Sequence, residues 1–362
     1  MNENGYGKAL SASEIEHLLN ALLKEGNQQT SNGHLIQPVC IWGKPGVGKT
    51  QIIMDLARKK GWGFSYCAPA QFEEMGDFHG IPVVENGRTV YNIPKWVPQD
   101  NGQPGILLLD DFNRSDDRIL RGLMQLLQHH GLMSWKLPSN WFIVCTANPE
   151  GDEYSVTTMD SAMLTRMMHV SLKFDAKEWA GWAIKNGVDP RGVDFVLTYP
   201  EIVAGYRTNP RSLTTFFHHL KGIKSLSEEM EKVHTLAMSL LDEETVSAFM
   251  VFIDHELNTL VSPEELFAAE KFELIKDKVR SAIMRDNKPR LDTLFTICTR
   301  IMIHLEHDLR AKRNYSNIVS FLLMPEIPND MRVSMQIQLN KLDIPELKKK
   351  MLDPKLVKMI LE

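Results

Sequence analysis

Gly43–Thr50 reads GKPGVGKT, the most informative segment of the sequence for the fold. It matches the pattern G-x-x-x-x-G-K-[ST], follows the apolar run Val39–Trp42 and opens the helical pattern Ile52–Lys60, as a phosphate-binding loop requires. The glycines let backbone N–H groups close around phosphate oxygens, while Lys49 reaches the terminal phosphates and Thr50 offers a hydroxyl to Mg²⁺. The residues predicted to hold the nucleotide are Gly43, Pro45, Gly46, Val47, Gly48, Lys49, Thr50 and Gln51.

A second cation contact is expected from the apolar run ILLLDD at Ile106–Asp111. This run predicts a buried strand that carries Asp110 to its carboxyl end, where open α/β sheets bind ligands. We therefore predict that Asp110 and Thr50 together hold the metal ion. Asp111 is then expected to face the attacking water, as its positioner or as a general base.

The pattern around these motifs predicts an α/β domain with a parallel sheet. Ser13 and Glu16 fit a capping box for a helix over Ser13–Lys24. Asn86-Gly87 within Pro82–Tyr91 predicts a hairpin, interpreted as an insertion in the sheet. Ser115 is expected to cap a helix that runs to Gln128. Three further strands are expected, at Gly63–Cys67, Ile106–Leu109 and Trp141–Thr146.

Helical patterns dominate after Ala176, so the second half is predicted to be all-helical. The expected helices cover Ser212–Leu220, Glu229–Leu257, Pro263–Met284, Leu291–Arg310 and most of Tyr315–Glu362. The expected domains are an N-terminal helix and linker at 1–33, an α/β core at 34–175, a helical lid at 176–310 and a helical C-terminal extension at 311–362.

Composition argues against several classes of protein. The 362 residues are 43% hydrophobic, which is enough for real cores. A net charge of −5 lacks the basic excess of dedicated nucleic-acid binders, so nucleic acid is disfavoured as a partner. The four cysteines lack metal-ligand spacing, which argues against a zinc site or disulfide framework. With neither a secretory pattern nor a long apolar run in the sequence, we expect no membrane span and a cytoplasmic location.

Residues 36–220 resemble the AAA+ ATPases, and within them the MoxR-like branch. The resemblance rests on several short segments in the order that the family has them. The strand with Asp110 continues into Asn113-Arg114, as in the family. The other segments are APAQFEEMGDFHGIP at Ala68–Pro82, IVCTANPEG at Ile143–Gly151, SAMLTRMMHV at Ser161–Val170 and TNPRSL at Thr208–Leu213.

This resemblance implies an AAA+ P-loop core with a helical lid that hydrolyses ATP with Mg²⁺. It implies that Asn148 is the sensor-1 residue, that Arg211 is the sensor-2 arginine and that Arg166, carried on a helix, is an arginine finger. In the family the finger comes from a neighbouring subunit, which implies a homo-oligomer, expected to be a hexameric ring. It also implies a von Willebrand factor A domain partner and a chaperone-like role in remodelling or activating another protein.

One departure from the family pattern concerns Asp111, because the usual residue there is Glu. The shorter side chain leaves two interpretations open, slow hydrolysis or a backbone that compensates for the missing methylene. An ATP-dependent switch therefore stays open as an alternative to a remodelling ATPase. A nucleic-acid motor or restriction-type NTPase subunit is a separate alternative, which the net charge of −5 disfavours. Arg114 also has two readings, a second contact to a neighbouring subunit or a local salt bridge.

Overall fold

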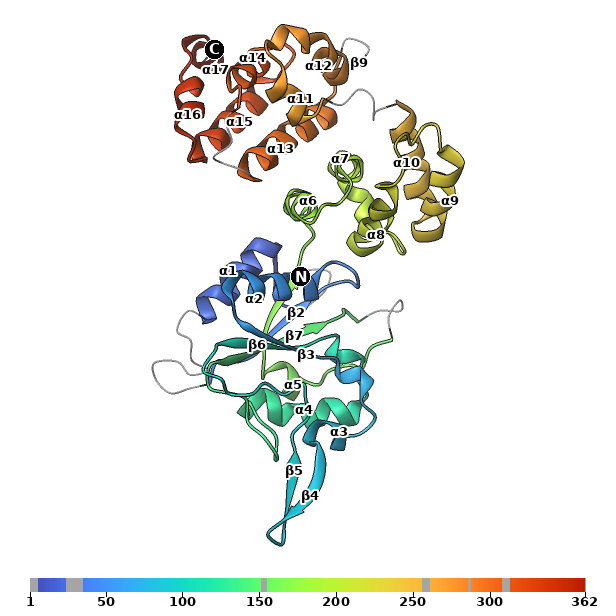
Figure 1. Cartoon of the computed structure of the whole chain (residues 1–362), viewed down its shortest axis with the longest axis vertical. Helices are drawn as coiled ribbons and strands as arrows, with labels where there is room; N and C mark the ends of the chain where they lie inside the picture. Colours follow the sequence, from blue (N-terminus) through green and yellow to red (C-terminus); the bar gives the residue numbers. More distant parts are fainter. Residues whose placement is uncertain are drawn as a thin grey trace. The chain divides into compact units, whose positions relative to one another are not determined.

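The computed structural model describes residues 6–23, 35–150, 155–255, 261–285, 288–307 and 313–361. The chain divides into two compact units, Met1–Asp175 and Ala176–Glu362 (Figure 1). Residues 26–33 of the predicted linker, and the expected ends of two helices at 256–257 and 308–310, lie outside the described residues.

A parallel sheet forms the centre of the first unit. Among the described residues it has six strands, in the order β1-β8-β2-β7-β6-β3. Every neighbouring pair is parallel, so all carboxyl ends lie along one edge. The strands are β1 (Lys8–Leu10), β2 (Val39–Trp42), β3 (Gly63–Cys67), β6 (Gly105–Leu109), β7 (Trp141–Ala147) and β8 (Met168–Leu172). The predicted strands are confirmed, whereas β1 and β8 are additions that we did not predict from the sequence.

Helices cover both faces of this sheet, as the continuous apolar strands require. Val39 and Ile41 of β2 face a core shared with α1 (Ala12–Leu23) and α2 (Lys49–Lys60). Cys40 and Trp42 point to the opposite core, which includes the leucines of α4 (Asp117–His129). Successive side chains of β2, the strand that leads into the P-loop, therefore pack alternately into the two cores.

Two predicted helix caps are wrong by one or two residues. Ser11 and Glu14, rather than Ser13 and Glu16, make the reciprocal contacts at the start of α1: the Ser11 N–H donates to Glu14 Oε2 at 2.9 Å. Asp116, rather than Ser115, caps α4, because its Oδ1 accepts from the Ile119 N–H at 2.9 Å. Several polar residues in a row can each fit a capping pattern, and the backbone direction selects one.

The predicted hairpin is confirmed as β4 (Ile81–Glu85) and β5 (Arg88–Asn92). Asn86 and Gly87 have φ values of 50° and 72°, as a turn with two left-handed residues needs. Its description as an insertion in the sheet is wrong, since β4 and β5 pair with each other and form a separate sheet. Figure 1 shows the hairpin extending away from the six-stranded sheet. The shorter elements of this unit are η1 (Pro69–Gln71), α3 (Gly76–His79), η2 (Phe112–Arg114) and α5 (Ser161–Leu164).

The second unit is helical, apart from a short pairing of β9 (Met284–Arg285) with β10 (Lys288–Pro289) that the sequence did not predict. Its helices as far as α12 are α6 (Ala176–Lys185), α7 (Pro190–Thr198), η3 (Pro200–Ala204), α8 (Pro210–Leu220), α9 (Met230–Leu240), α10 (Glu243–His255), α11 (Pro263–Ala268), η4 (Phe272–Leu274) and α12 (Lys276–Ile283). The rest are α13 (Leu291–His307), α14 (Ser316–Leu322), α15 (Asn329–Lys341), α16 (Pro345–Met351) and α17 (Pro354–Leu361). In the described ranges, no helix combines the length and apolar character that a membrane crossing requires.

Two long predicted helices are each divided in the structure. The pattern Glu229–Leu257 breaks between α9 and α10, where Asp242 accepts hydrogen bonds from the N–H groups of Arg207 and Thr208. The pattern Pro263–Met284 breaks between α11 and α12. The helical spacing of apolar residues continues across both breaks, so it does not show where a helix ends. The break between α9 and α10 is located by the contacts of Asp242 with residues distant in sequence.

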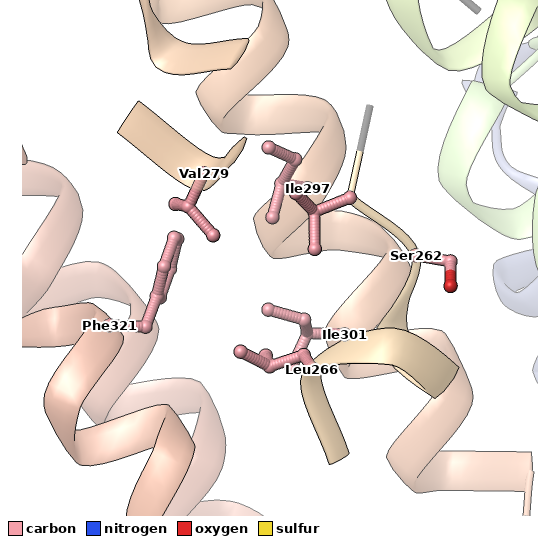
Figure 2. Close-up of a pocket in the computed structure, with 7 residues that line it drawn as sticks. Ser262, Leu266, Val279, Ile297, Ile301 and Phe321 are labelled. Carbon is pink, nitrogen blue, oxygen red and sulfur yellow. The ribbon is translucent and has the colours of Figure 1, made fainter. Parts of the chain in front are cut away.

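A small apolar gap lies between the helices α11 to α14 (Figure 2). Its one polar side chain is Ser262, whose hydroxyl accepts from the Glu265 N–H at 3.1 Å and caps α11. A ligand pocket needs polar groups that orient its occupant. We therefore interpret this gap as a packing feature. The residues that line it are Val261, Ser262, Leu266, Val279, Ile297, Ile301 and Phe321.

A buried ion pair joins α7 to α13 in the same unit. Arg300 Nε lies 2.7 Å from Asp194 Oδ1, and the two side chains are only 10% and 8% exposed. Burial raises the pKa of Asp194 to about 6, and the charge of Arg300 opposes that rise. The carboxylate therefore depends on this arginine to stay ionised at neutral pH.

We expect Arg300→Met to destabilise the protein by about 3–5 kcal/mol, because it leaves a buried carboxylate without its cation. The loss should be larger at pH 8 than at pH 5. A carboxyl group whose folded-state pKa is raised contributes stability below its unfolded pKa and loses it as the pH rises through the folded value. Chemical denaturation of the full chain, followed by circular dichroism, measures this effect.

The matched control is Lys276→Met, which breaks an exposed ion pair with Glu273 and should change stability by about 1 kcal/mol or less. The double variant Asp194→Leu/Arg300→Met should recover most of the loss. Equal stability of Arg300→Met and wild type at pH 8 would contradict this account of the pair.

Candidate nucleotide-binding site

The P-loop connects β2 to α2 with two glycines in the left-handed region. Gly46 has a φ of 77° and Gly48 a φ of 108°, conformations that residues with a side chain rarely adopt. Gly48 is also the N-cap of α2, where no side chain occupies the first N–H groups. The loop therefore presents backbone donors at a helix N-terminus, the arrangement that binds phosphate.

Lys49 is the first residue of α2, and only 5% of it is exposed. Its Nζ donates to the Gly43 carbonyl at 2.7 Å, to the Lys44 carbonyl at 3.3 Å and to Asn148 Oδ1 at 3.0 Å. These acceptors hold the ammonium group over the loop. Bound phosphate oxygens would have to compete with them for its protons.

Asp110 lies directly after β6, at the carboxyl edge of the sheet. Its Oδ1 accepts from the hydroxyls of Thr50 at 2.8 Å and Thr146 at 2.6 Å. Thr50 and Asp110 thus supply neighbouring oxygen atoms, the donor type that Mg²⁺ prefers. The residues present fit a magnesium ion at this position.

Tyr66 contacts the other oxygen of the same carboxylate, at 3.2 Å from Asp110 Oδ2. Burial and then the charge of Asp110 raise the pKa of Tyr66 to about 12, which keeps its hydroxyl a donor at neutral pH. Sequence reasoning missed both Tyr66 and Thr146. Their position in the sequence could have indicated them, because each lies one residue before the end of a strand, β3 or β7, that reaches this edge of the sheet.

Asp111 has a left-handed backbone, with φ 48° and ψ 40°. Its N–H donates to Thr146 Oγ1 at 2.8 Å, and its Oδ1 accepts from Asn148 Nδ2 at 3.0 Å. Its Oδ2 lies 3.5 Å from Arg114 Nε in the same chain. Arg114 therefore makes the local salt bridge that was one of its two readings.

Asn148 follows β7, is fully buried and links the P-loop to Asp111. Its Oδ1 accepts from Lys49 while its Nδ2 donates to Asp111. Its backbone is held by Asn113, which accepts from the Asn148 N–H at 3.0 Å and donates to the Asn148 carbonyl at 2.8 Å. A change at Lys49 can therefore be transmitted to Asp111 through one side chain.

Arg166 lies away from this group of residues. The helix expected to carry it, within SAMLTRMMHV, is wrong: α5 ends at Leu164, and Met168 already belongs to β8. Because β8 is parallel to β2, Arg166 lies at the amino edge of the sheet, across the length of a strand from the P-loop. Its partly exposed guanidinium contacts Gln128 Oε1 at 3.2 Å and the Ala162 carbonyl.

Arg211 belongs to the second unit, in the first turn of α8. Asn209 caps this helix by accepting from the N–H groups of Arg211 and Ser212, and the Arg211 side chain is exposed. Its role as sensor 2 stays a prediction.

Comparison with known proteins agrees with this arrangement. Residues 38–167 match the family model of the AAA domain (dynein-related subfamily). This segment is an AAA domain. It contains the P-loop, Asp110, Asp111, Asn148 and Arg166, and the whole chain has an AAA+ P-loop core followed by a helical C-terminal region.

Solved structures of RuvB from Thermotoga maritima were also found. The one described as a Holliday junction branch migration motor is 16% identical, with a TM-score of 0.37, and the match covers 74% of this chain and 76% of that one. A RuvB point mutant is 14% identical, with a TM-score of 0.40 and coverage of 77% and 82%. No curated protein matches the chain.

Proposed function

We propose that the protein is a Mg²⁺-dependent ATP hydrolase that acts as a homo-oligomeric ring. One observation carries the proposal: Asn148 contacts both Lys49 and Asp111, while Thr50 and Asp110 pair beside them. These contacts support a site at one edge of the sheet in which Lys49 would bind phosphate, Thr50 and Asp110 would bind the cation and Asp111 would face water.

In this proposal each residue has one task. Lys49 leaves its carbonyl acceptors and neutralises the terminal phosphates. Thr50 and Asp110 hold Mg²⁺, which neutralises charge on the phosphates when bound. Asp111 orients a water molecule and accepts its proton as the water oxygen bonds to the terminal phosphorus. The bond between that phosphorus and the bridging oxygen breaks at the same time, and ADP leaves with the electron pair. Asn148 keeps Asp111 directed at that position.

More specifically, we propose that the protein is a MoxR-like ATPase that remodels or activates a partner protein, a proposal that the motifs from Ala68 to Leu213 support. A hexameric ring and a von Willebrand factor A domain partner rest on that resemblance. Arg211 is proposed to sense the nucleotide from the helical region. Turnover stimulated by DNA would favour the nucleic-acid motor instead, and ATP binding without turnover in the assembled state would favour a switch.

Lys49→Ala tests the site itself. We expect nucleotide affinity to fall by about 100-fold or more, because charge-assisted hydrogen bonds to phosphate are lost and a helix N-terminus alone is a weak cationic site. Titration calorimetry with a slowly hydrolysed ATP analogue measures the loss.

The control is Lys60→Ala, which removes an exposed lysine from the opposite end of α2 and should leave affinity unchanged. Unchanged far-UV circular dichroism would show that both variants fold. Micromolar binding retained by Lys49→Ala would exclude the proposed role of this lysine.

A further inference from the structure

The Asp110 carboxylate accepts hydrogen bonds from three hydroxyls on three different elements. Thr50 of α2 and Thr146 of β7 both contact Oδ1, and Tyr66 of β3 contacts Oδ2. Tyr66 therefore differs from the threonines, because it restrains the second oxygen. Hydrogen bonds to both oxygens limit rotation of the carboxylate about its bond to Cβ.

The position of Tyr66 follows from strand register. Tyr66 pairs with Leu108 of β6, and the Asp110 N–H donates to the Cys67 carbonyl at 2.8 Å, one step beyond the last strand pair. This hydrogen bond brings the end of β3 against Asp110. Cys67 faces the buried core, whereas Tyr66 is 45% exposed. Core packing therefore does not explain why a tyrosine reaches this carboxylate.

The Thr50 hydroxyl donates its one proton to Asp110 Oδ1, which leaves its lone pairs available to a cation. Both threonines hold Oδ1, so among the contacts that the structure describes Tyr66 is the one that restrains Oδ2. Groups that orient a metal-binding carboxylate typically change metal affinity by 10- to 100-fold when they are removed. We propose that Tyr66 is a positioning residue that orients Asp110 for Mg²⁺, an inference that rests on the proposed function.

Tyr66→Phe tests this role because it removes one hydroxyl and keeps the aromatic ring of an edge strand. The probe is a fluorescent, slowly hydrolysed ATP analogue, titrated with MgCl₂ on the full-length protein. We expect the Mg²⁺ concentration at half-maximal binding to rise about tenfold, near the lower end for such groups because Tyr66 is partly exposed. Binding of the analogue in EDTA should equal that of wild type.

Tyr91→Phe is the matched control, since it removes a tyrosine hydroxyl from the hairpin of the same unit and should not move the midpoint. In an Asp110→Ala background, Tyr66→Phe should cause no further change, because Tyr66 acts through that carboxylate. An unchanged midpoint for Tyr66→Phe, or an equal loss of binding in EDTA, would overturn the positioning role. Failure of the wild type to bind the analogue would instead overturn the proposed function, and this inference with it.

Discussion

Asp111→Asn is expected to bind ATP and Mg²⁺ normally and to turn over about 10²- to 10⁴-fold more slowly than the wild type. An amide cannot accept a proton from water, while Asn keeps the oxygen that accepts from Asn148 Nδ2. Asn also tolerates the left-handed backbone at this position, so the local fold should persist. Single-turnover hydrolysis, measured beside analogue binding, separates chemistry from affinity.

Asp117→Asn is the control, because it alters an exposed carboxylate in the first turn of α4 that pairs with Arg121. It should leave the rate within a factor of about two, as exposed ion pairs contribute little. If Asp111→Asn hydrolysed ATP at the wild-type rate, another group would have to orient the water, and the role proposed for Asp111 would be wrong.

Asp111→Glu distinguishes the two interpretations of the short side chain. The structure favours a backbone adapted to Asp, because a left-handed residue is far better accommodated as Asp or Asn than as Glu. The carboxylate is also already within 3.0 Å of Asn148. We therefore expect Asp111→Glu to hydrolyse more slowly than wild type. A higher rate would mean that the missing methylene limits the reaction.

Short sequence motifs predicted the parts of the fold that depend on residues adjacent in sequence. The P-loop glycines and the Asn86-Gly87 turn each require a particular backbone conformation, and both are found where the sequence placed them. The strand β8 was missed because SAMLTRMMHV was assigned as a whole to a helix, although Met168–Leu172 alternates apolar and polar residues as a strand does. Its pairing with β1 and β2, both distant in sequence, makes this segment extended.

The residues of the candidate site also fall into two groups, those that belong to a sequence motif and those that do not. Lys49, Thr50 and Asp110 carry sequence motifs, and the structure brings all three to one edge of the sheet. Tyr66 and Thr146 carry no motif of their own chemistry. Their contacts depend on which strands are neighbours and on their register, so they become visible only when β3, β6 and β7 are assembled.

Arg166 and the P-loop lie at opposite edges of the sheet. Met168 pairs with Val39 at the amino end of β2, whereas the P-loop follows the carboxyl end of that strand. The four residues of β2 separate the two positions by roughly 13 Å at about 3.3 Å per residue. We therefore propose that this partly exposed arginine acts on the nucleotide of a different subunit rather than on its own.

Arg166→Ala is accordingly expected to bind ATP normally and to hydrolyse it about 10³- to 10⁵-fold more slowly, the range for loss of an arginine finger. Mixing it with Lys49→Ala should restore part of the activity, because a Lys49→Ala subunit still offers Arg166 to a neighbour that binds ATP. Arg121→Ala, which removes an exposed arginine of the same unit, should keep the wild-type rate and serves as the control. If subunits are shown to exchange and no activity returns, Arg166 does not act across an interface, and the proposed ring would lose this chemical support.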